Sequence, residues 1–256
     1  MKNTVRKIII GNWKMNPRSA KEAEKLFANV AKAVAQIKKT EVVICPPFLY
    51  LEKLKKLSRK ISLGAQDSFW EEVGPYTGEV SAEMLYNLGA KYVILGHSER
   101  RTLGETNSLI NKKIKGAFSA GLCPILCVGE NIRAPDHGYF NLVKMQIEEC
   151  LAGISKNSIS KIIIAYEPVW ALSSTPDRRD ATAEDAREMA VFIHKILFDK
   201  FGTEATKARV IYGGSANEKD ALDFLQNGGV DGLLPGKASL DVQKFSEIIR
   251  IAESLA

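Results

Sequence analysis

A single carboxylate, Glu167, stands at a position suited to proton transfer. It follows the apolar run at 162–164, which is typical of a buried strand, and Pro168 and Trp170 come directly after it. A carboxylate at a strand end can accept a proton from a bound molecule, and a rigid proline beside a large aromatic suits the hinge of a closing lid. A glutamate here can equally be solvated or pair with the next helix, so this segment alone is weak evidence.

Two further side chains could stabilise the charge that proton removal creates. A carboxylate removes a carbon-bound proton only when the neighbouring oxygen is stabilised as it becomes negative. Lys14 and His97 are the available donors. His97 leads into a helical turn, where the positive end of the helix dipole favours the neutral ring. A neutral imidazole can donate a proton and take it back, so the three groups together suit proton transfer beside a carbonyl.

Two glycine-bearing turns provide a candidate anion site. One ends in Ser215, after Tyr-Gly-Gly, and the other carries Gly236 and Lys237. Such turns expose backbone N–H groups before a helix, and these groups bind phosphate well. Taken singly, each of these residues has an ordinary explanation as a tight turn, a surface lysine or a structural histidine.

The composition is that of an ordinary globular protein. Its 256 residues are 45% hydrophobic and 26% charged, which is enough apolar material for a large core. Among single domains, an α/β barrel or a large sandwich routinely reaches this length. The net charge of +6 comes from basic residues that are spread among acids along the whole chain. We therefore expect no nucleic-acid partner.

Neither a membrane segment nor paired cysteines are expected. No apolar run is long enough to cross a bilayer, and the run at 8–10 is too short for a signal-peptide core. We therefore expect a cytoplasmic protein. The four cysteines lack zinc or redox spacing and are expected to be buried free thiols: Cys45, Cys123, Cys127 and Cys150.

Apolar and amphipathic segments alternate strictly along the chain. Short β-rich runs predict strands at 7–13, 41–45, 61–65, 92–96, 124–129, 161–166, 210–213 and 232–234. Helical periodicity predicts helices at 20–37, 49–57, 82–88, 108–120, 139–152, 183–201, 218–226 and 240–255. Such alternation requires parallel strands joined by crossover helices. We predict one domain over 1–256, a closed (β/α)8 barrel, with an open doubly wound sheet as the alternative.

In such a barrel the reactive groups gather where strands end and the following loops begin. The ends of the predicted strands carry the chemical groups described above: Lys14, His97, Glu167, Ser215 and Lys237. The fold hypothesis therefore brings them to one face, and their joint occurrence there is a much stronger signal than any one residue.

Several segments match motifs of a known family. The chain reads Gly11-Asn12-Trp13-Lys14-Met15-Asn16, Gly74-Pro75-Tyr76-Thr77-Gly78-Glu79-Val80-Ser81, Gly96-His97-Ser98-Glu99-Arg100-Arg101, Cys127-Val128-Gly129-Glu130, Ala165-Tyr166-Glu167-Pro168-Val169-Trp170-Ala171 and Tyr212-Gly213-Gly214-Ser215. These segments closely resemble those of the triosephosphate isomerase family, and the resemblance runs from residue 7 to about residue 255. It implies a TIM barrel.

The resemblance also implies an activity and roles. Members interconvert dihydroxyacetone phosphate and D-glyceraldehyde 3-phosphate through an enediolate, with Glu167 as base and His97 as electrophile and proton shuttle. Lys14 and Asn12 would hold the substrate and its developing oxyanion, and Glu99 would fix the ammonium of Lys14 from behind. No metal or organic cofactor is implied.

A homodimer is implied by the same resemblance. The loop 66–79 would insert into a second subunit and place Thr77 near the partner's Asn12 and the partner's Glu99. Phe69 and Trp70, expected to be exposed in this long loop, would find burial at that interface.

The expected lid, residues 173–180, departs from the family pattern. It is longer and lacks the usual glycines. Ser173 takes the place of the glycine whose N–H reaches the phosphate, and a serine keeps that N–H while restricting the backbone. Pro176 is expected to stiffen the lid. Arg178 and Arg179 could pair with nearby acids, attract phosphate or simply be solvated.

The last phosphate turn departs as well. The family usually has two adjacent glycines where this chain has Gly236 and Lys237. A side chain there demands either ordinary or strained backbone angles. We expect the N–H of Lys237 to face the phosphate while its ammonium points outward or adds charge attraction. Asp67, where the family usually has Asn, concerns the dimer loop and leaves the chemistry unchanged.

Two other kinds of function stay open at the level of sequence. The altered lid and Lys14 are compatible with another phosphosugar isomerase or a Schiff-base aldolase on the same barrel. The basic pI near 9.0 and the altered phosphate turns are compatible with a non-catalytic phosphate-binding or nucleic-acid-binding relative. A binding protein, however, has no evident need for Glu167.

Overall fold

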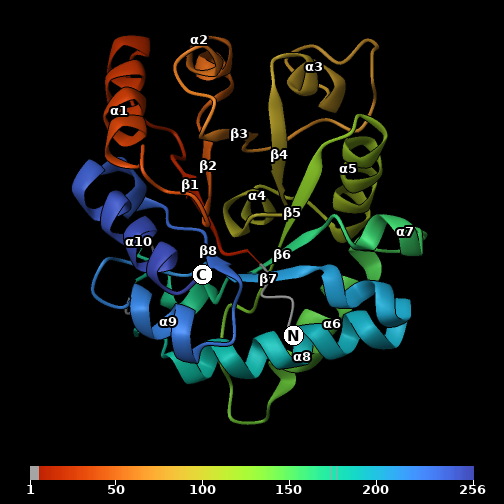
Figure 1. The fold of residues 1–256 in the computed structure, drawn as a ribbon. Helices are drawn as coiled ribbons and strands as arrows, with labels where there is room; N and C mark the ends of the chain where they lie inside the picture. The colour runs from red at the N-terminus through yellow and green to blue at the C-terminus, as the bar shows by residue number, and fades with distance from the viewer. Residues whose placement is uncertain (1–5, 174, 177) are drawn as a thin grey trace.

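The chain forms a closed barrel of parallel strands surrounded by helices. The computed structural model describes residues 6–173, 175–176 and 178–256, so Ser174 and Asp177 of the expected lid lie outside the described residues. Figure 1 shows the strands at the centre and the helices around them. The strands are β1 (Ile8–Asn12), β2 (Glu41–Cys45), β3 (Ser62–Ala65), β4 (Ala90–Leu95), β5 (Cys123–Val128), β6 (Ile163–Tyr166), β7 (Arg209–Tyr212) and β8 (Gly232–Leu233).

Neighbouring strands pair in parallel around the whole ring, and β8 returns to β1. At their carboxyl ends the register aligns Asn12 with Cys45, and Tyr166 with both Val128 and Tyr212. These ends therefore meet at one mouth of the barrel. The closed barrel predicted from the sequence is confirmed, and the open doubly wound sheet is wrong.

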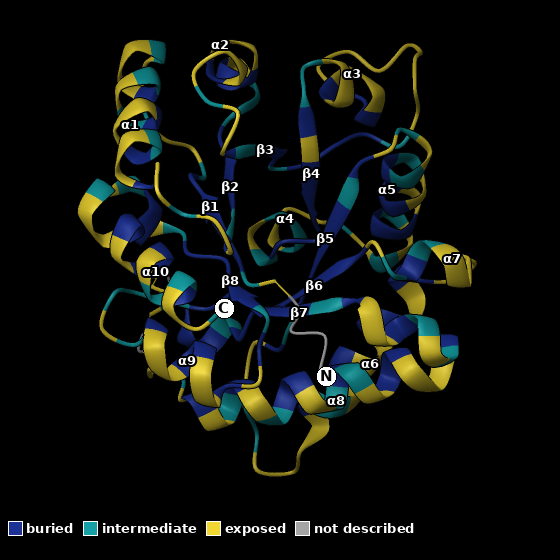
Figure 2. Cartoon of the chain, viewed as in Figure 1, coloured by how far each residue is buried: buried dark blue, intermediate teal, exposed yellow. Residues whose placement is uncertain are grey.

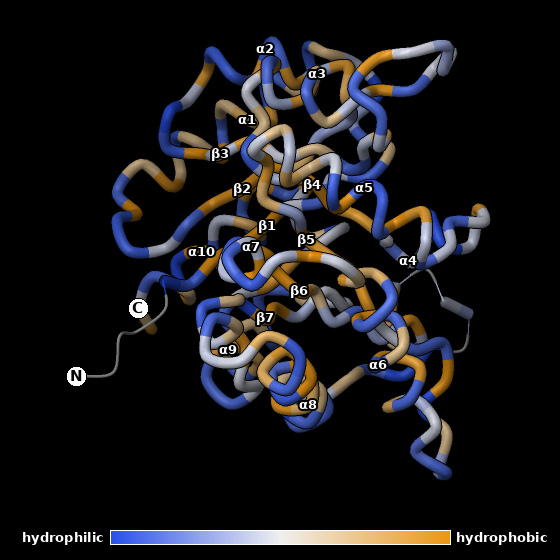
Figure 3. Tube along the Cα trace, turned by 90° about the vertical axis from the view of Figure 1, so that its right-hand side faces the viewer, coloured by the Kyte–Doolittle hydropathy of each residue, from blue (hydrophilic) through white to orange (hydrophobic). Residues whose placement is uncertain are grey.

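Each strand packs on both of its faces, which explains its nearly continuous apolar sequence. One face points into the barrel, where Ile10, Ile94 and Ile211 belong to a buried interior cluster. The other face packs against the helices, with Phe27 and Phe245 among its fully buried partners. Figure 2 shows the strands as mainly buried and the helices as exposed on their outer sides, and Figure 3 shows hydrophobic residues concentrated along the strands.

The helices follow the predicted order with small changes at their ends. They are α1 (Ala20–Ala33), α2 (Leu51–Lys55), α3 (Ala82–Asn87), α4 (Ser98–Thr102), α5 (Asn107–Ser119), α6 (Gly138–Cys150), α7 (Lys156–Ile159), α8 (Ala183–Phe201), α9 (Ala221–Asn227) and α10 (Val242–Ser254), with 3-10 helices η1 (Phe48–Tyr50), η2 (Val169–Ala171), η3 (Gly202–Lys207) and η4 (Lys237–Leu240). The first helix ends four residues earlier than predicted, because Val34 takes non-helical angles at its cap. Helices α4 and α7 are too short for periodicity to detect.

The structure also bears on the predictions about cysteines and membrane segments. Cys45, Cys127 and Cys150 are buried free thiols, as predicted, whereas Cys123 is only partly buried. Among the described residues, no helix combines the length and the apolar character needed to cross a membrane.

Candidate active site

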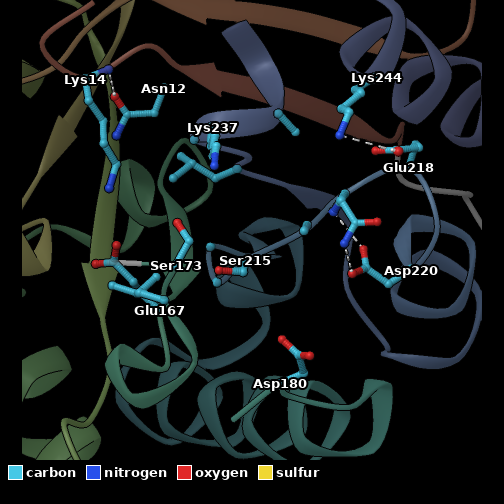
Figure 4. Close-up of a pocket in the computed structure, with 18 of the residues that line it drawn as sticks. Asn12, Lys14, Glu167, Ser173, Asp180, Ser215, Glu218, Asp220, Lys237 and Lys244 are labelled. Atoms are coloured by element: carbon cyan, nitrogen blue, oxygen red, sulfur yellow. Dashed lines mark hydrogen bonds and ion pairs between the residues drawn. The ribbon is translucent and has the colours of Figure 1, made fainter. Parts of the chain in front are cut away.

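A pocket of about 530 Å3 opens at the carboxyl-terminal mouth of the barrel. Its walls include every residue that the sequence placed in the site except Glu99: Asn12, Lys14, His97, Glu167, Ser173, Ser215, Gly236 and Lys237. Figure 4 shows Asn12 and Lys14 on one side of this pocket, with Ser215 and Lys237 nearer its centre. The barrel therefore brings together residues that are up to 225 positions apart.

Glu167 follows β6 directly and is only 2% exposed. Its N–H donates to the Val128 carbonyl at 2.8 Å, which holds its backbone against the end of β5. Gly129 makes this approach possible, because a β-carbon there would lie 1.9 Å from the Glu167 carbonyl oxygen. Gly129 belongs to the motif Cys127-Val128-Gly129-Glu130, from which this role was not predicted.

The carboxylate of Glu167 has unequal partners. Oε2 accepts from the Ser98 N–H at 2.9 Å. Oε1 lies 2.9 Å from His97 Nε2, yet it makes no well-aligned hydrogen bond within the described residues. Burial would raise the pKa of Glu167, but the neighbouring His97 ring and the Ser98 N–H outweigh burial and leave the pKa below its ordinary value. Glu167 is therefore ionised at neutral pH, with one oxygen available to a ligand.

His97 caps the short helix α4 and is 5% exposed. Its Nδ1 accepts the Glu99 N–H at 3.2 Å. A ring nitrogen that accepts a hydrogen bond carries no proton, so this contact assigns the neutral tautomer with its proton on Nε2. That N–H is then on the side of Glu167 and the pocket.

Lys14 takes a left-handed backbone conformation, with φ of 52°, just after the end of β1. Its N–H donates to Asn12 Oδ1 at 3.0 Å, and its carbonyl accepts from Gln66 Nε2 at 2.8 Å. Its ammonium donates to Glu99 Oε1 at 2.5 Å. A left-handed lysine is costly and persists only when its surroundings fix it, as these contacts do.

The candidate phosphate side of the pocket is more open. Ser173 and Lys237 are exposed, and Ser215 is partly buried. Lys237 begins η4, so its backbone takes ordinary helical angles rather than strained ones. Gly236 lies against Lys14, because a β-carbon there would be 3.3 Å from Lys14 Cε. Figure 4 shows the side chain of Lys237 directed into the space between Lys14 and Ser215.

Charged residues that were not predicted from the sequence extend the pocket beyond β7. Lys244 of α10 lies 3.8 Å from Glu218, and the Asn217 side chain donates to Asp220 at 2.6 Å. Burial raises the pKa of Asp220, with help from the negative charges of Asp180 and Glu218. Asn217, Glu218 and Asp220 come soon after the end of β7, so the positional rule that found Ser215 could have found them, whereas Lys244 lies within α10.

A buried network lies beneath the hinge of the lid. Glu130 is 1% exposed and accepts from the Tyr166 hydroxyl and from Trp170 Nε1, each at 2.8 Å. Arg133 lies 3.2 Å from Glu130 and donates to the Tyr166 hydroxyl at 2.9 Å. Trp170 is thereby held at its indole nitrogen. In the part of the chain that the structure describes, no group of three His, Cys, Asp or Glu is placed to bind a metal.

The loop 66–79 corrects one sequence expectation. Phe69 is 8% exposed, and it stacks on Trp70 at 3.9 Å between ring centroids and packs on Tyr76 at 4.6 Å. Phe69 is therefore buried within the chain and Trp70 is partly buried, so the expectation that both are exposed is wrong. The exposed apolar residues of the loop are Val73, at 79%, and Tyr76, at 41%.

The fold and the site together define a class, the (β/α)8-barrel enzymes that carry an acid, an imidazole and a lysine at the carboxyl-terminal mouth. The family model described as triosephosphate isomerase matches residues 7–252. The chain belongs to the triosephosphate isomerase family.

Individual relatives agree with this assignment. The chain is 45% identical over 250 residues to the triosephosphate isomerase of Dictyoglomus thermophilum, with 96% of this chain and 99% of the relative covered. It is 41% identical over 250 residues to that of Aquifex aeolicus, with the same coverage. The crystal structure of triosephosphate isomerase from Bartonella henselae is similar at a TM-score of 0.84 and 35% identity, covering 96% of this chain and 99% of that one.

Proposed function

We propose that this chain is a triose-phosphate isomerase that interconverts dihydroxyacetone phosphate and D-glyceraldehyde 3-phosphate. The observation that carries this proposal is the buried, ionised Glu167, whose Oε1 faces the pocket beside the neutral ring of His97. The membership of the chain in the triosephosphate isomerase family favours this activity over that of an aldolase or a non-catalytic binding protein.

In the proposed reaction Glu167 removes a proton from the hydroxymethyl carbon of dihydroxyacetone phosphate. The electrons move to the carbonyl oxygen, and the Nε2–H of His97 and the ammonium of Lys14 stabilise the resulting enediolate. His97 transfers protons between the two enediolate oxygens, and Glu167 returns its proton to the adjacent carbon. Triosephosphate isomerase is the standard example of a glutamate base working beside a neutral histidine. The reaction moves only protons, so it needs no cofactor.

Glu99 and Asn12 are positioning groups in this proposal. Glu99 holds the ammonium of Lys14 at 2.5 Å and gives its N–H to His97, so one residue orients both donors. Asn12, 4% exposed, accepts the Lys14 N–H and supports its left-handed backbone.

The substrate phosphate is proposed to lie on the open side of the pocket. Backbone N–H groups of Ser173, Ser215, Gly236 and Lys237 would bind it. The ammonium of Lys237 would add charge attraction, because no acid lies within ion-pair distance of it among the described residues.

We further propose a single-domain chain that acts in the cytoplasm, where the triose phosphates of glycolysis and gluconeogenesis are made and consumed, and that forms a homodimer. The loop 66–79 would insert into the second subunit, with Thr77 near the partner's Asn12 and the partner's Glu99. The exposed Val73 and Tyr76 on this loop support the proposal, since apolar loop residues gain most from burial. A monomer in sedimentation velocity at micromolar concentration would contradict it.

The test of the activity is a coupled assay of triose-phosphate interconversion on the purified chain and on Glu167→Gln. The glutamine keeps the shape of the side chain but cannot accept the proton, so we expect kcat to fall by about 10²- to 10⁴-fold. Circular dichroism and the melting temperature should stay close to those of the parent. Equal rates for the two proteins would defeat the assignment of the base.

A further inference from the structure

We infer that Arg179 is a positioning residue that ties the two ends of the lid together through Trp170. The guanidinium carbon of Arg179 lies 4.2 Å from the centre of the Trp170 ring. Trp170 belongs to the hinge at the start of the lid, and Arg179 lies nine residues later, just before α8 begins. The contact therefore joins a residue just before the lid to one near its end.

Trp170 is held by two contacts, one at its indole nitrogen and one at its ring face. Its indole N–H donates to Glu130 and its ring face contacts Arg179, and Trp170 as a whole is only 7% exposed. A flat guanidinium stacks on an aromatic face with both charge and contact area, a geometry that an ammonium does not reproduce. The second arginine of the lid is engaged differently, because Arg178 pairs with Asp180 at 2.8 Å.

A second contact works in the same direction. The Thr175 hydroxyl donates to the Val169 carbonyl at 2.5 Å, and its N–H donates to Leu172 at 3.0 Å. Both bonds fold the lid back onto its hinge. A lid without glycines has fewer backbone conformations available, and contacts at its base restrict them further. These contacts hold Thr175 and Arg179 against the hinge, and Ser173 lies at the wall of the pocket.

This inference rests on the proposed function, because the position of Ser173 matters only if the pocket binds a phosphate. Two substitutions separate stacking from charge. Arg179→Lys keeps the positive charge and loses the planar group, whereas Arg179→Met loses both. For a stacking tie at an exposed site we expect both variants to raise the KM for glyceraldehyde 3-phosphate about two- to five-fold, with kcat little changed and no dependence on salt.

The matched control is Arg59→Met. Arg59 is exposed near the start of β3, at the opposite end of the barrel, and its loss removes the same charge. This variant should keep the parent KM. If Arg179→Lys keeps the parent KM while the effect of Arg179→Met disappears at high salt, Arg179 acts by charge and the tie is refuted.

A second measurement does not depend on turnover. In a chain labelled with 5-fluorotryptophan, the ¹⁹F resonance of Trp170 is identified by its absence in Trp170→Phe. Both Arg179 variants should shift this resonance and weaken the binding of inorganic phosphate, while the resonances of Trp13 and Trp70 stay in place. An unchanged Trp170 resonance would refute the contact between Arg179 and Trp170, whether or not the chain is an isomerase. A shifted resonance in a chain without isomerase activity would contradict only the proposed function.

Discussion

The two ends of the barrel contain similar charged groups that are held in different ways. At the amino-terminal end, Glu41 accepts from the Tyr92 hydroxyl and pairs with Arg209 at 2.8 Å, so both of its oxygens are occupied. At the mouth, Glu167 has one oxygen on the Ser98 N–H and the other without an aligned donor in the described structure. The pKa of each carboxyl lies below its ordinary value.

The comparison shows that charge and a shifted pKa do not by themselves identify a catalytic group. What distinguishes Glu167 is an incomplete set of partners at the wall of a pocket. In a barrel, the amino-terminal end serves stability and the carboxyl-terminal end serves chemistry. Substitutions at the two ends should therefore affect different measurements.

Among the substitutions that compare the two ends, the largest effect is expected from Lys14→Met at the mouth. Removing a donor that stabilises the enediolate should lower kcat/KM about 10²- to 10³-fold. Glu99→Gln, which removes only the charged partner of that ammonium, should cause a smaller loss. Lys32→Met, on the exposed side of α1, provides the matched control. If Lys14→Met has the same kcat/KM as this control, the assignment of catalysis to the carboxyl-terminal mouth is contradicted.

At the other end, Glu41→Gln should change stability and leave catalysis intact. Burial would raise the pKa of Glu41, but the Tyr92 hydroxyl and Arg209 outweigh it, so the folded protein favours the ionised form. This stabilisation is present above the pKa of the unfolded chain and is lost as the pH falls through the lower folded pKa.

We expect Glu41→Gln to lower the free energy of unfolding at pH 7 by about 1–3 kcal/mol, because Arg209 keeps a weakened partner. The difference from the parent should shrink in urea titrations below about pH 4. Glu247→Gln, in an exposed pair with Arg250, should have little effect. A loss of kcat in Glu41→Gln would contradict the division between the two ends.

The smallest effect is expected at Lys237, which is exposed on the open side of the pocket. Lys237→Met should raise the KM about two- to five-fold at low ionic strength, and the difference should fade as salt screens the charge. Because Lys237 takes ordinary helical angles, methionine fits its backbone. The KM of the parent and of Lys237→Met is measured at 20 mM and 500 mM salt, which bracket weak and strong screening. If the two proteins have the same KM at both salt concentrations, Lys237 contributes only its backbone N–H.

The sequence could predict the barrel and the place of the site because both follow from local patterns. The buried parallel strand 41–45 is apolar in every residue after Glu41, and its bounds were predicted to the residue. Given parallel strands, the position of Glu167 just after β6 already fixed the face on which it lies.

The contacts that tune the site could not be predicted in this way. Nothing local in the sequence indicates that the Ser98 N–H meets Glu167 or that Arg179 stacks on Trp170. The prediction that Phe69 is exposed was wrong for the same reason, because Phe69 is buried by contacts with Trp70 and Tyr76. Side-chain partners depend on the distance between elements, which periodicity does not contain.

The close approach of Gly129 to the Glu167 carbonyl has a consequence for mutational tolerance. A β-carbon at 1.9 Å from a backbone oxygen cannot be absorbed by turning a side chain, so β6 itself would have to move. A selection that randomises position 129 and scores growth should therefore recover glycine alone. Position 129 would then tolerate substitution less than its neighbours do, although glycine has no side chain and takes no part in the reaction.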